Sequence, residues 1–160
     1  MTSVEKAYIA GFLDGDGCVM AQLVKHKDYK LGFQIRVSIV FYQKSKNQQI
    51  LSWLKSILQR GYIRQRNDDM TELTIVGPVE VRKTLVLLQP FLRLKSELAQ
   101  KVIELIDLLP AKMDAKTLLR LSKLVDQTAK FTYSKKRTNT SATVQEYLQK
   151  HKLFPVETSS

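Results

Sequence analysis

Residues 8–17 of the chain read YIAGFLDGDG, an apolar run that passes directly into two aspartates separated by a single glycine. Thr2 and Glu5 stand at the spacing of a capping box, which predicts that a helix begins just after Thr2. Apolar side chains surround most of this helix, so we expect it to be buried on more than one side. Small residues on it would let a second backbone approach closely: Ala7, Ala10 and Gly11.

The rest of the chain alternates between predicted strand pairs and helices. Strands are expected at 18–24, 33–43, 62–66 and 72–76, and helices at about 47–59, 79–89, 96–108 and 114–130. Asp114 is the expected N-cap of the last of these helices, and Gly61 is expected to end the helix at 47–59. The order αββαββα, with extra C-terminal helices, predicts an α+β fold that has helices on one face of an antiparallel sheet and leaves the other open.

Two parts of the chain are expected to differ in organisation. Residues 1–131 read as one core domain, and residues 132–160 as a basic C-terminal extension with a short helix near 141–151 and a disordered end. The single cysteine excludes an internal disulfide and favours a reducing compartment. No apolar run approaches the length of a membrane span, and the first residues lack the pattern of a signal peptide, so we expect a protein that is not secreted and has no membrane partner.

The charge is large and uneven. The chain has 26 Lys and Arg against 15 Asp and Glu, a formal net charge of +11. Residues 17–67 hold ten of the basic residues and one acid, Asp28, which gives +9 in that segment, while the other 16 basic and 14 acidic residues nearly cancel. Such a field attracts polyanions, nucleic acid first and an anionic membrane surface second, although a solvated polar face would have the same composition.

The Asp-Gly-Asp-Gly segment has three interpretations. A glycine-rich turn between a helix and a strand is the simplest. An EF-hand is excluded, because twelve positions counted from Asp14 end at Lys25 rather than at a glutamate. The third is an oxygen ligand for Mg²⁺, an ion that takes one or two carboxylates and fills its other positions with water and phosphate.

The segment IAGFLDGDG, residues 9–17, resembles the LAGLIDADG motif. The segments FYQKSKNQQ, YIRQR and PFLRLKSELAQKV follow in the order and spacing of the same family, so the resemblance extends over about residues 5–150. The chain is similar to LAGLIDADG homing endonucleases of the single-motif, group I intron-encoded type. This resemblance implies a homodimer that cuts both strands of DNA at a long pseudo-palindromic target and starts intron mobility in a chloroplast or mitochondrion.

The resemblance also implies roles for individual residues. Asp16 corresponds to the metal-binding acid, with the Gly15 carbonyl as a second ligand and Mg²⁺ as the cofactor. Gln43 and Lys95 correspond to the polar residues around the attacking water and the scissile phosphate. Asn47 departs from an arginine found in some relatives, and Lys46 or Lys44 would supply that charge. The expected dimer interface consists of Ala7, Ala10, Gly11 and Asp14, with bracing of the helix end as the favoured role of Asp14.

Contacts to double-stranded DNA are expected on the open sheet face, because an antiparallel ribbon fits the major groove. By resemblance, the base contacts are Gln22, His26, Tyr29, Gln34, Arg36, Ser38, Arg64, Arg66, Glu72 and Thr74. The phosphate contacts are Lys44, Lys46, Lys135 and Arg137. For His26, a solvated loop residue is the alternative.

Three other functions remain open at the level of sequence. Some LAGLIDADG proteins are RNA maturases, which would make intron RNA the partner, and others are DNA-binding regulators that do not cleave. A structural component of a ribonucleoprotein would explain the charge but not a metal ligand. The presence of Asp16, Gln43 and Lys95 favours the endonuclease over all three.

Overall fold

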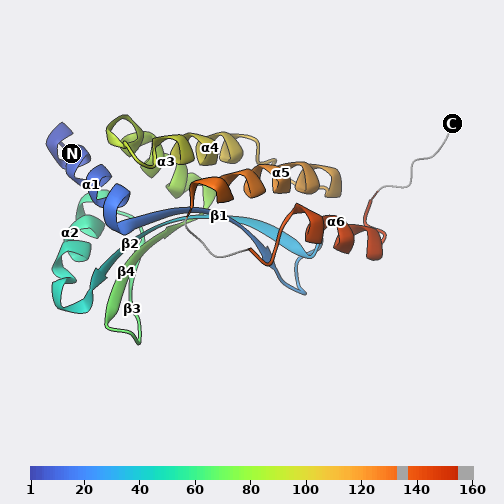
Figure 1. Cartoon of the computed structure of the whole chain (residues 1–160), viewed down its shortest axis with the longest axis horizontal. Coiled ribbons are helices and arrows are strands. Elements are labelled where there is room, and N and C mark those ends of the chain that lie inside the picture. Colours follow the sequence, from blue (N-terminus) through green and yellow to red (C-terminus); the bar gives the residue numbers. More distant parts are fainter. Residues whose placement is uncertain (133–136, 155–160) are drawn as a thin grey trace. The chain divides into compact units, whose positions relative to one another are not determined.

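The computed structural model describes residues 1–132 and 137–154 (Figure 1). The chain divides into two compact units. The first unit contains residues 1–20 and 37–106, and the second contains residues 21–36 and 107–160. Lys135 and the end of the chain that was expected to be disordered lie outside the described residues. The order of helices and strands confirms the αββαββα prediction and its additional C-terminal helices.

Helix α1 (Ser3–Asp16) opens the first unit with the predicted capping box. The Glu5 N–H donates to Thr2 Oγ1 at 3.1 Å, and the Thr2 N–H donates to Glu5 Oε2 at 2.7 Å. One side of α1 is completely buried through Ile9, Ala10 and Leu13. The opposite side remains exposed, although much of it is apolar.

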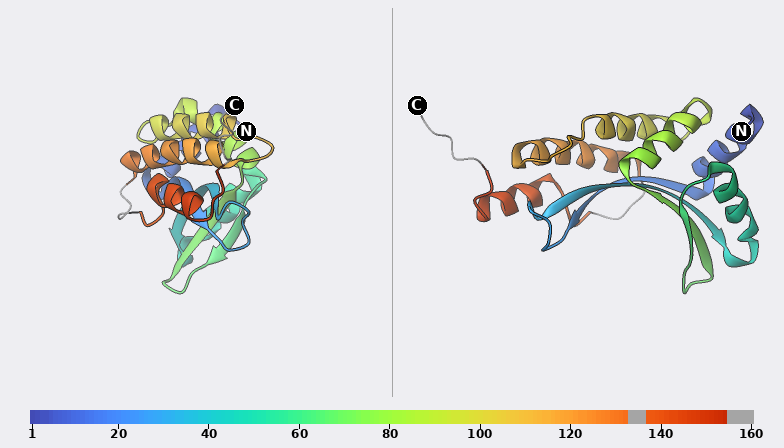
Figure 2. Two further views of the ribbon diagram at one scale, coloured as in Figure 1. Left: turned by 90° about the vertical axis from the view of Figure 1, so that its right-hand side faces the viewer. Right: turned by 180° about the vertical axis from the view of Figure 1, so that it is seen from behind.

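A four-stranded antiparallel sheet carries the candidate site. Its strand order is β1 (Gly17–Lys25), β2 (Phe33–Lys44), β4 (Met70–Val76), β3 (Tyr62–Gln65). In the first unit, α2 (Gln49–Leu58) packs on β3 and β4, and α3 (Pro78–Leu88) packs on β4 and α1. Figure 2 shows α2 on one side of β3 and β4 and no helix of this unit on the other side. The unit also contains η1 (Ser45–Asn47), η2 (Gln89–Phe91) and α4 (Ser96–Asp107).

Two local predictions were wrong. Helix α2 ends at Gln59, which adopts a left-handed conformation with φ 55°, and not at Gly61. Gly61 is needed for a different reason, because a Cβ there would lie 2.8 Å from the Thr74 carbonyl oxygen on β4. The alternation of β2 also fails at its centre, where Ser38 and Val40 are buried on the face expected to be open. Strand β2 lies between β1 and β4, so side chains of both neighbours cover it.

The second unit combines the outer ends of β1 and β2 with α5 (Ala115–Thr128), η3 (Ala129–Phe131) and α6 (Ser141–Lys150). Asp114 is the N-cap of α5, as predicted, and accepts the Thr117 N–H at 2.8 Å. That hydrogen bond lowers the pKa of Asp114 below its usual 3.8. Helix α6 packs on α5, and the Tyr147 ring meets Phe33 edge to face, with the ring centres 5.6 Å apart.

Candidate functional site

The two aspartates at the end of α1 have different surroundings. The Asp14 carboxylate accepts backbone N–H groups from Arg93 at 2.8 Å, Leu94 at 3.2 Å and Lys95 at 2.9 Å. It therefore braces the segment between η2 and α4, which agrees with the bracing role favoured from the sequence. Asp16 is the last residue of α1, and its side chain is exposed.

The brace also fixes the position of Lys95. The Lys95 ammonium donates to the Asp14 carbonyl at 2.6 Å, near the C-terminal end of α1. The last four carbonyls of a helix lack partners within the helix, and a cation next to them is favoured by the helix dipole. In α1 the Leu13 and Asp14 carbonyls are taken by the Gly17 N–H and by Lys95, and the Gly15 carbonyl is one of the remaining two.

A hollow of about 400 Å³ lies where α1 ends and the adjoining strands meet. Its lining brings together four of the predicted site residues, which are Asp16, Gly15, Gln43 and the expected phosphate contact Lys44. The Gln43 Oε1 accepts the Lys44 N–H at 2.9 Å, which leaves the amide N–H groups as donors. Tyr42 and Met70 also line this hollow, although the sequence interpretation gave neither a role.

The acid end of α1 suits a hard cation that is shared with a phosphate. Within residues 1–132 and 137–154 no three His, Cys, Asp or Glu side chains lie close enough to form a metal cluster. One exposed carboxylate and one helix-end carbonyl are the type of partial ligand set that Mg²⁺ uses with water and phosphate oxygens.

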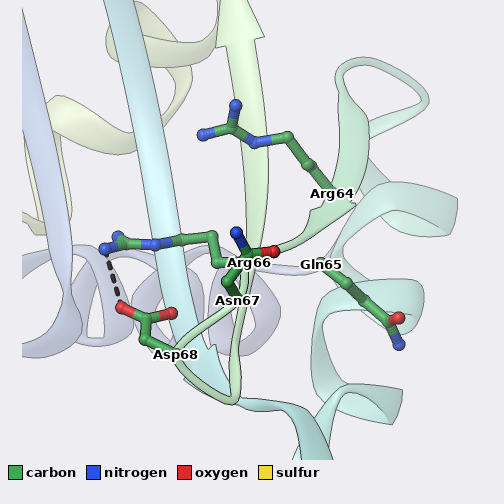
Figure 3. Close-up of a pocket in the computed structure, with 5 residues that line it drawn as sticks. All are labelled: Arg64, Gln65, Arg66, Asn67 and Asp68. Atoms are coloured by element: carbon green, nitrogen blue, oxygen red, sulfur yellow. Dashed lines mark hydrogen bonds and ion pairs between the residues drawn. The ribbon is translucent and has the colours of Figure 1, made fainter.

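The open face of the sheet places the predicted arginines in a row with an acid. Tyr42 on β2 lies opposite Glu72 on β4, and Glu72 lies opposite Arg64 on β3. Arg64 binds Glu72 Oε1 through Nε at 2.9 Å and Nη2 at 2.6 Å. Arg66 binds Asp68 at 2.8 Å and lies 3.8 Å from Glu72 Oε2. Figure 3 shows Arg64 and Arg66 on one side of their strand and Gln65 pointing to the other.

Three of the predicted base contacts are less accessible than the sequence pattern suggested. Ser38, Glu72 and Thr74 are only 3%, 7% and 5% exposed. Each has cross-strand neighbours in the sheet: Thr74 lies between Val40 and Tyr62, Glu72 lies between Tyr42 and Arg64, and Ser38 lies opposite Val76. Glu72 in particular holds the Arg64 guanidinium in place.

The second unit carries the remaining predicted contacts. Gln22, Gln34 and Arg36 are exposed on β1 and β2. His26 and Tyr29 lie in the loop that joins these strands, and His26 Nδ1 accepts the Asp28 N–H at 3.1 Å. Arg137 donates to the Ala21 and Val125 carbonyls at 2.9 and 3.2 Å, so its guanidinium has a role within the chain.

The exposed side of α1 matches only part of the predicted dimer interface. Ala7 and Gly11 are exposed, together with Val4 at 79% and Tyr8 at 52%. Ala10, by contrast, is fully buried by its own chain and has no surface to offer a partner. The apolar spacing of α1 indicated two buried sides but could not say which small residue belongs to which.

Comparisons with known proteins agree with this geometry. The LAGLIDADG endonuclease family model matches residues 9–93. The chain is 40% identical over 144 residues to DNA endonuclease I-CvuI of Chlorella vulgaris, covering 90% of this chain and 89% of the relative. It is 34% identical over 142 residues to DNA endonuclease I-CreI of Chlamydomonas reinhardtii, covering 88% and 86%. The chain therefore belongs to the LAGLIDADG endonuclease family.

Solved structures place the chain among homing endonucleases. A crystal structure of I-CvuI in complex with its target DNA in the presence of calcium matches with a TM-score of 0.91 and 38% identity, covering 95% of this chain and 97% of that one. The archaeal intron-encoded homing endonuclease I-Vdi141I, complexed with DNA, matches with a TM-score of 0.82 and 20% identity over 94% and 98% of the two chains. At that identity, the second match shows the fold alone.

Proposed function

We propose that this protein is a site-specific homing endonuclease that cuts both strands of a long, pseudo-palindromic DNA target. The observation that carries the proposal is the exposed carboxylate of Asp16, at the end of a helix in a chain 40% identical to a DNA endonuclease over 90% of its length. A protein that only binds DNA needs no exposed acid facing the phosphates, since that charge would repel them.

The working unit is a homodimer in which two α1 helices pack against each other. Gly11 supports this arrangement, because glycine inside a helix costs about 1 kcal/mol relative to alanine. Nothing in its own chain lies within 4 Å of a Cβ placed there, so the chain itself gives no reason for a glycine. The exposed Val4 and Tyr8 on the same helix add apolar area that a second copy would cover.

Mg²⁺ is the proposed cofactor, and Asp16 with the Gly15 carbonyl would hold it. When bound, such an ion lowers the pKa of water and stabilises the oxygen that leaves phosphorus. Crystals of I-CvuI with DNA were obtained with calcium and with magnesium, which supports a divalent cation. Gln43 orients water through its amide, and Lys95 offsets phosphate charge from its anchor on α1.

The open face of the sheet is the surface that recognises the DNA sequence in this proposal. Arg64 binds Glu72 through the Nε and Nη2 edge, and the edge formed by Nη1 and Nη2 remains able to bind guanine. The other residues proposed to contact bases are the exposed Arg66, Gln34, Arg36 and Gln22, together with His26 and Tyr29 in the loop. Lys44 and Lys46 are the proposed phosphate contacts of the first unit, and Lys135 and Arg137 those of the C-terminal extension, residues 132–160.

Intron mobility in a chloroplast or mitochondrion is the proposed biological role. The two curated relatives are DNA endonucleases, and matched structures include intron-encoded homing endonucleases. The RNA maturase and the regulator without cleavage are the competing functions.

Within residues 1–132 and 137–154, no helix is both long and apolar enough to cross a membrane.

A cleavage selection tests the proposal. The full chain is incubated with a randomised duplex library and Mg²⁺, and the cut ends are sequenced, with a chelator control. We expect one long, partly palindromic site that is cut only when Mg²⁺ is present. Specific binding without cutting would favour the regulator, and binding of intron RNA in place of any duplex would favour the maturase.

A further inference from the structure

Tyr42 lies between the arginine row and the acid end of α1. In the register of β2 and β4 it is directly opposite Glu72, the residue that holds Arg64. It also lines the hollow that contains Asp16. Among the residues that the structure describes, Tyr42 alone belongs both to the row with Glu72 and Arg64 and to that hollow.

The Tyr42 side chain is half-buried and carries a hydroxyl that its own chain does not use. Among residues 1–132 and 137–154, no hydrogen bond is made by this hydroxyl. Burial of the ring raises the pKa of Tyr42 above its usual 10.0, and neighbouring Cys18 and Glu72 raise it further. The phenol therefore keeps its proton at neutral pH and offers both a donor and an acceptor.

The surroundings of this hydroxyl suit a base edge better than a phosphate. Glu72, directly across from Tyr42, is already paired with Arg64 and lies near Arg66, and the neutral phenol hydroxyl matches the neutral donors and acceptors that base edges carry. A DNA strand that runs from Arg64 to the acid end of α1 must pass Tyr42. On the function proposed above, the nucleotide beside Tyr42 would lie between the base pairs that Arg64 reads and the bond to be cut.

We propose that Tyr42 is a specificity-determining residue whose hydroxyl hydrogen bonds to the edge of a base beside the scissile phosphate. This proposal rests on the endonuclease function proposed above. A wrong base at that position leaves the half-buried hydroxyl without a partner, and a missing partner of this kind discriminates strongly between substrates. Discrimination by Tyr42 therefore acts on the base pair nearest the cut in each half-site.

The test uses Tyr42→Phe, which keeps the ring and removes only the hydroxyl. The matched control is Tyr62→Phe, because Tyr62 is on the same sheet face in the neighbouring row with Thr74 and does not line the hollow. Cleavage rates are measured on the wild-type target and on every symmetric single-base-pair variant of it. Thermal unfolding of each protein shows that the fold is retained.

We expect Tyr42→Phe to lower the preference at one symmetric pair of positions about fivefold, with the other positions within about twofold of the wild type. Tyr42→Gln should shift the preferred base there toward adenine, since an amide pairs with adenine. An unchanged profile, or an equal loss at every sequence, would overturn the proposal.

The experiment distinguishes a wrong role for Tyr42 from a wrong assignment of the endonuclease function. If the wild type binds a specific duplex without cutting it, the same variants are scored by binding, and the preference at that position still decides the role of Tyr42. If the wild type neither binds nor cuts any duplex, both proposals are overturned together.

Discussion

Asp14 and Asp16 are two residues apart, yet their surroundings differ. Asp14 accepts three backbone N–H groups from 93–95, while Asp16 is exposed beside the hollow. The sequence predicted a difference between them, since only Asp16 corresponds to the last acid of the motif. It could not show that Asp14 also positions Lys95, because that contact joins residues 81 positions apart.

Replacement of Asp14 by alanine should lower the free energy of unfolding by about 2 kcal/mol or more. Hydrogen bonds to a charged acceptor are worth about 1.5–3 kcal/mol each, and the three N–H groups lose theirs together. Urea unfolding measures the change. Asp68→Ala is the matched control, because its exposed pair with Arg66 should contribute at most about 1 kcal/mol. Equal losses in the two variants would contradict the bracing role.

Replacement of Arg64 by alanine should weaken binding to the specific target by about 1–3 kcal/mol and leave nonspecific binding nearly unchanged. Its guanidinium is held by the buried Glu72, so its remaining edge is oriented before DNA arrives. Titration of specific and random duplexes at two salt concentrations measures both affinities. Lys44→Ala is the control for a phosphate contact and should weaken both equally. The same uniform loss for Arg64→Ala would demote it to a phosphate contact.

At the scale of elements, the starts of helices were predictable and one of their ends was not. Thr2 and Asp114 cap α1 and α5 through local hydrogen bonds that a sequence pattern can reveal. Helix α2 is closed by Gln59 in a left-handed conformation, whereas Gly61 is required by its close approach to β4, a contact between residues distant in the chain. Burial of Ser38 and Val40 has the same kind of cause, since the neighbours of a central strand are set by topology.

The stability of α5 should depend on pH through Asp114. Its pKa is lowered in the folded state by the Thr117 N–H, so the cap is strongest above the unfolded value and is lost as pH falls through the folded one. Thermal unfolding of the wild type and of Asp114→Asn is measured from neutral pH to below pH 3.8. The wild type should lose stability relative to the variant at the acid end. Parallel curves would show that the ionised carboxylate has no special role as cap.

At the scale of the whole molecule, the family resemblance predicted more of the structure than the local sequence patterns did. The αββαββα order, the open sheet face and the family were all predicted and are confirmed. The open face was predicted too simply, because its centre is filled by Ser38, Val40 and Thr74. Only the structure shows which side of α1 is exposed. Ala7 and Ala10 are the same residue type, but Ala7 is exposed and Ala10 is buried.

Replacement of Gly11 by leucine should leave the fold intact and prevent self-association. Beyond its own helix, no described atom lies within 4 Å of a Cβ at this position, and a leucine there would block a second helix that packs against α1. Sedimentation velocity over a range of concentrations measures the association state. Ala142→Leu, at an exposed position on α6, is the matched control and should associate like the wild type. Wild-type association by Gly11→Leu would place the dimer contact elsewhere.

The central claim is that Asp16 supports metal-dependent cutting and contributes little to the fold or to DNA binding. The most direct measurement compares Asp16→Asn with the wild type for cleavage of the selected target in Mg²⁺, for binding to that target and for thermal unfolding. We predict that cleavage is abolished while affinity and unfolding temperature stay close to those of the wild type. Cleavage at the wild-type rate, or loss of the fold together with cleavage, would contradict the claim.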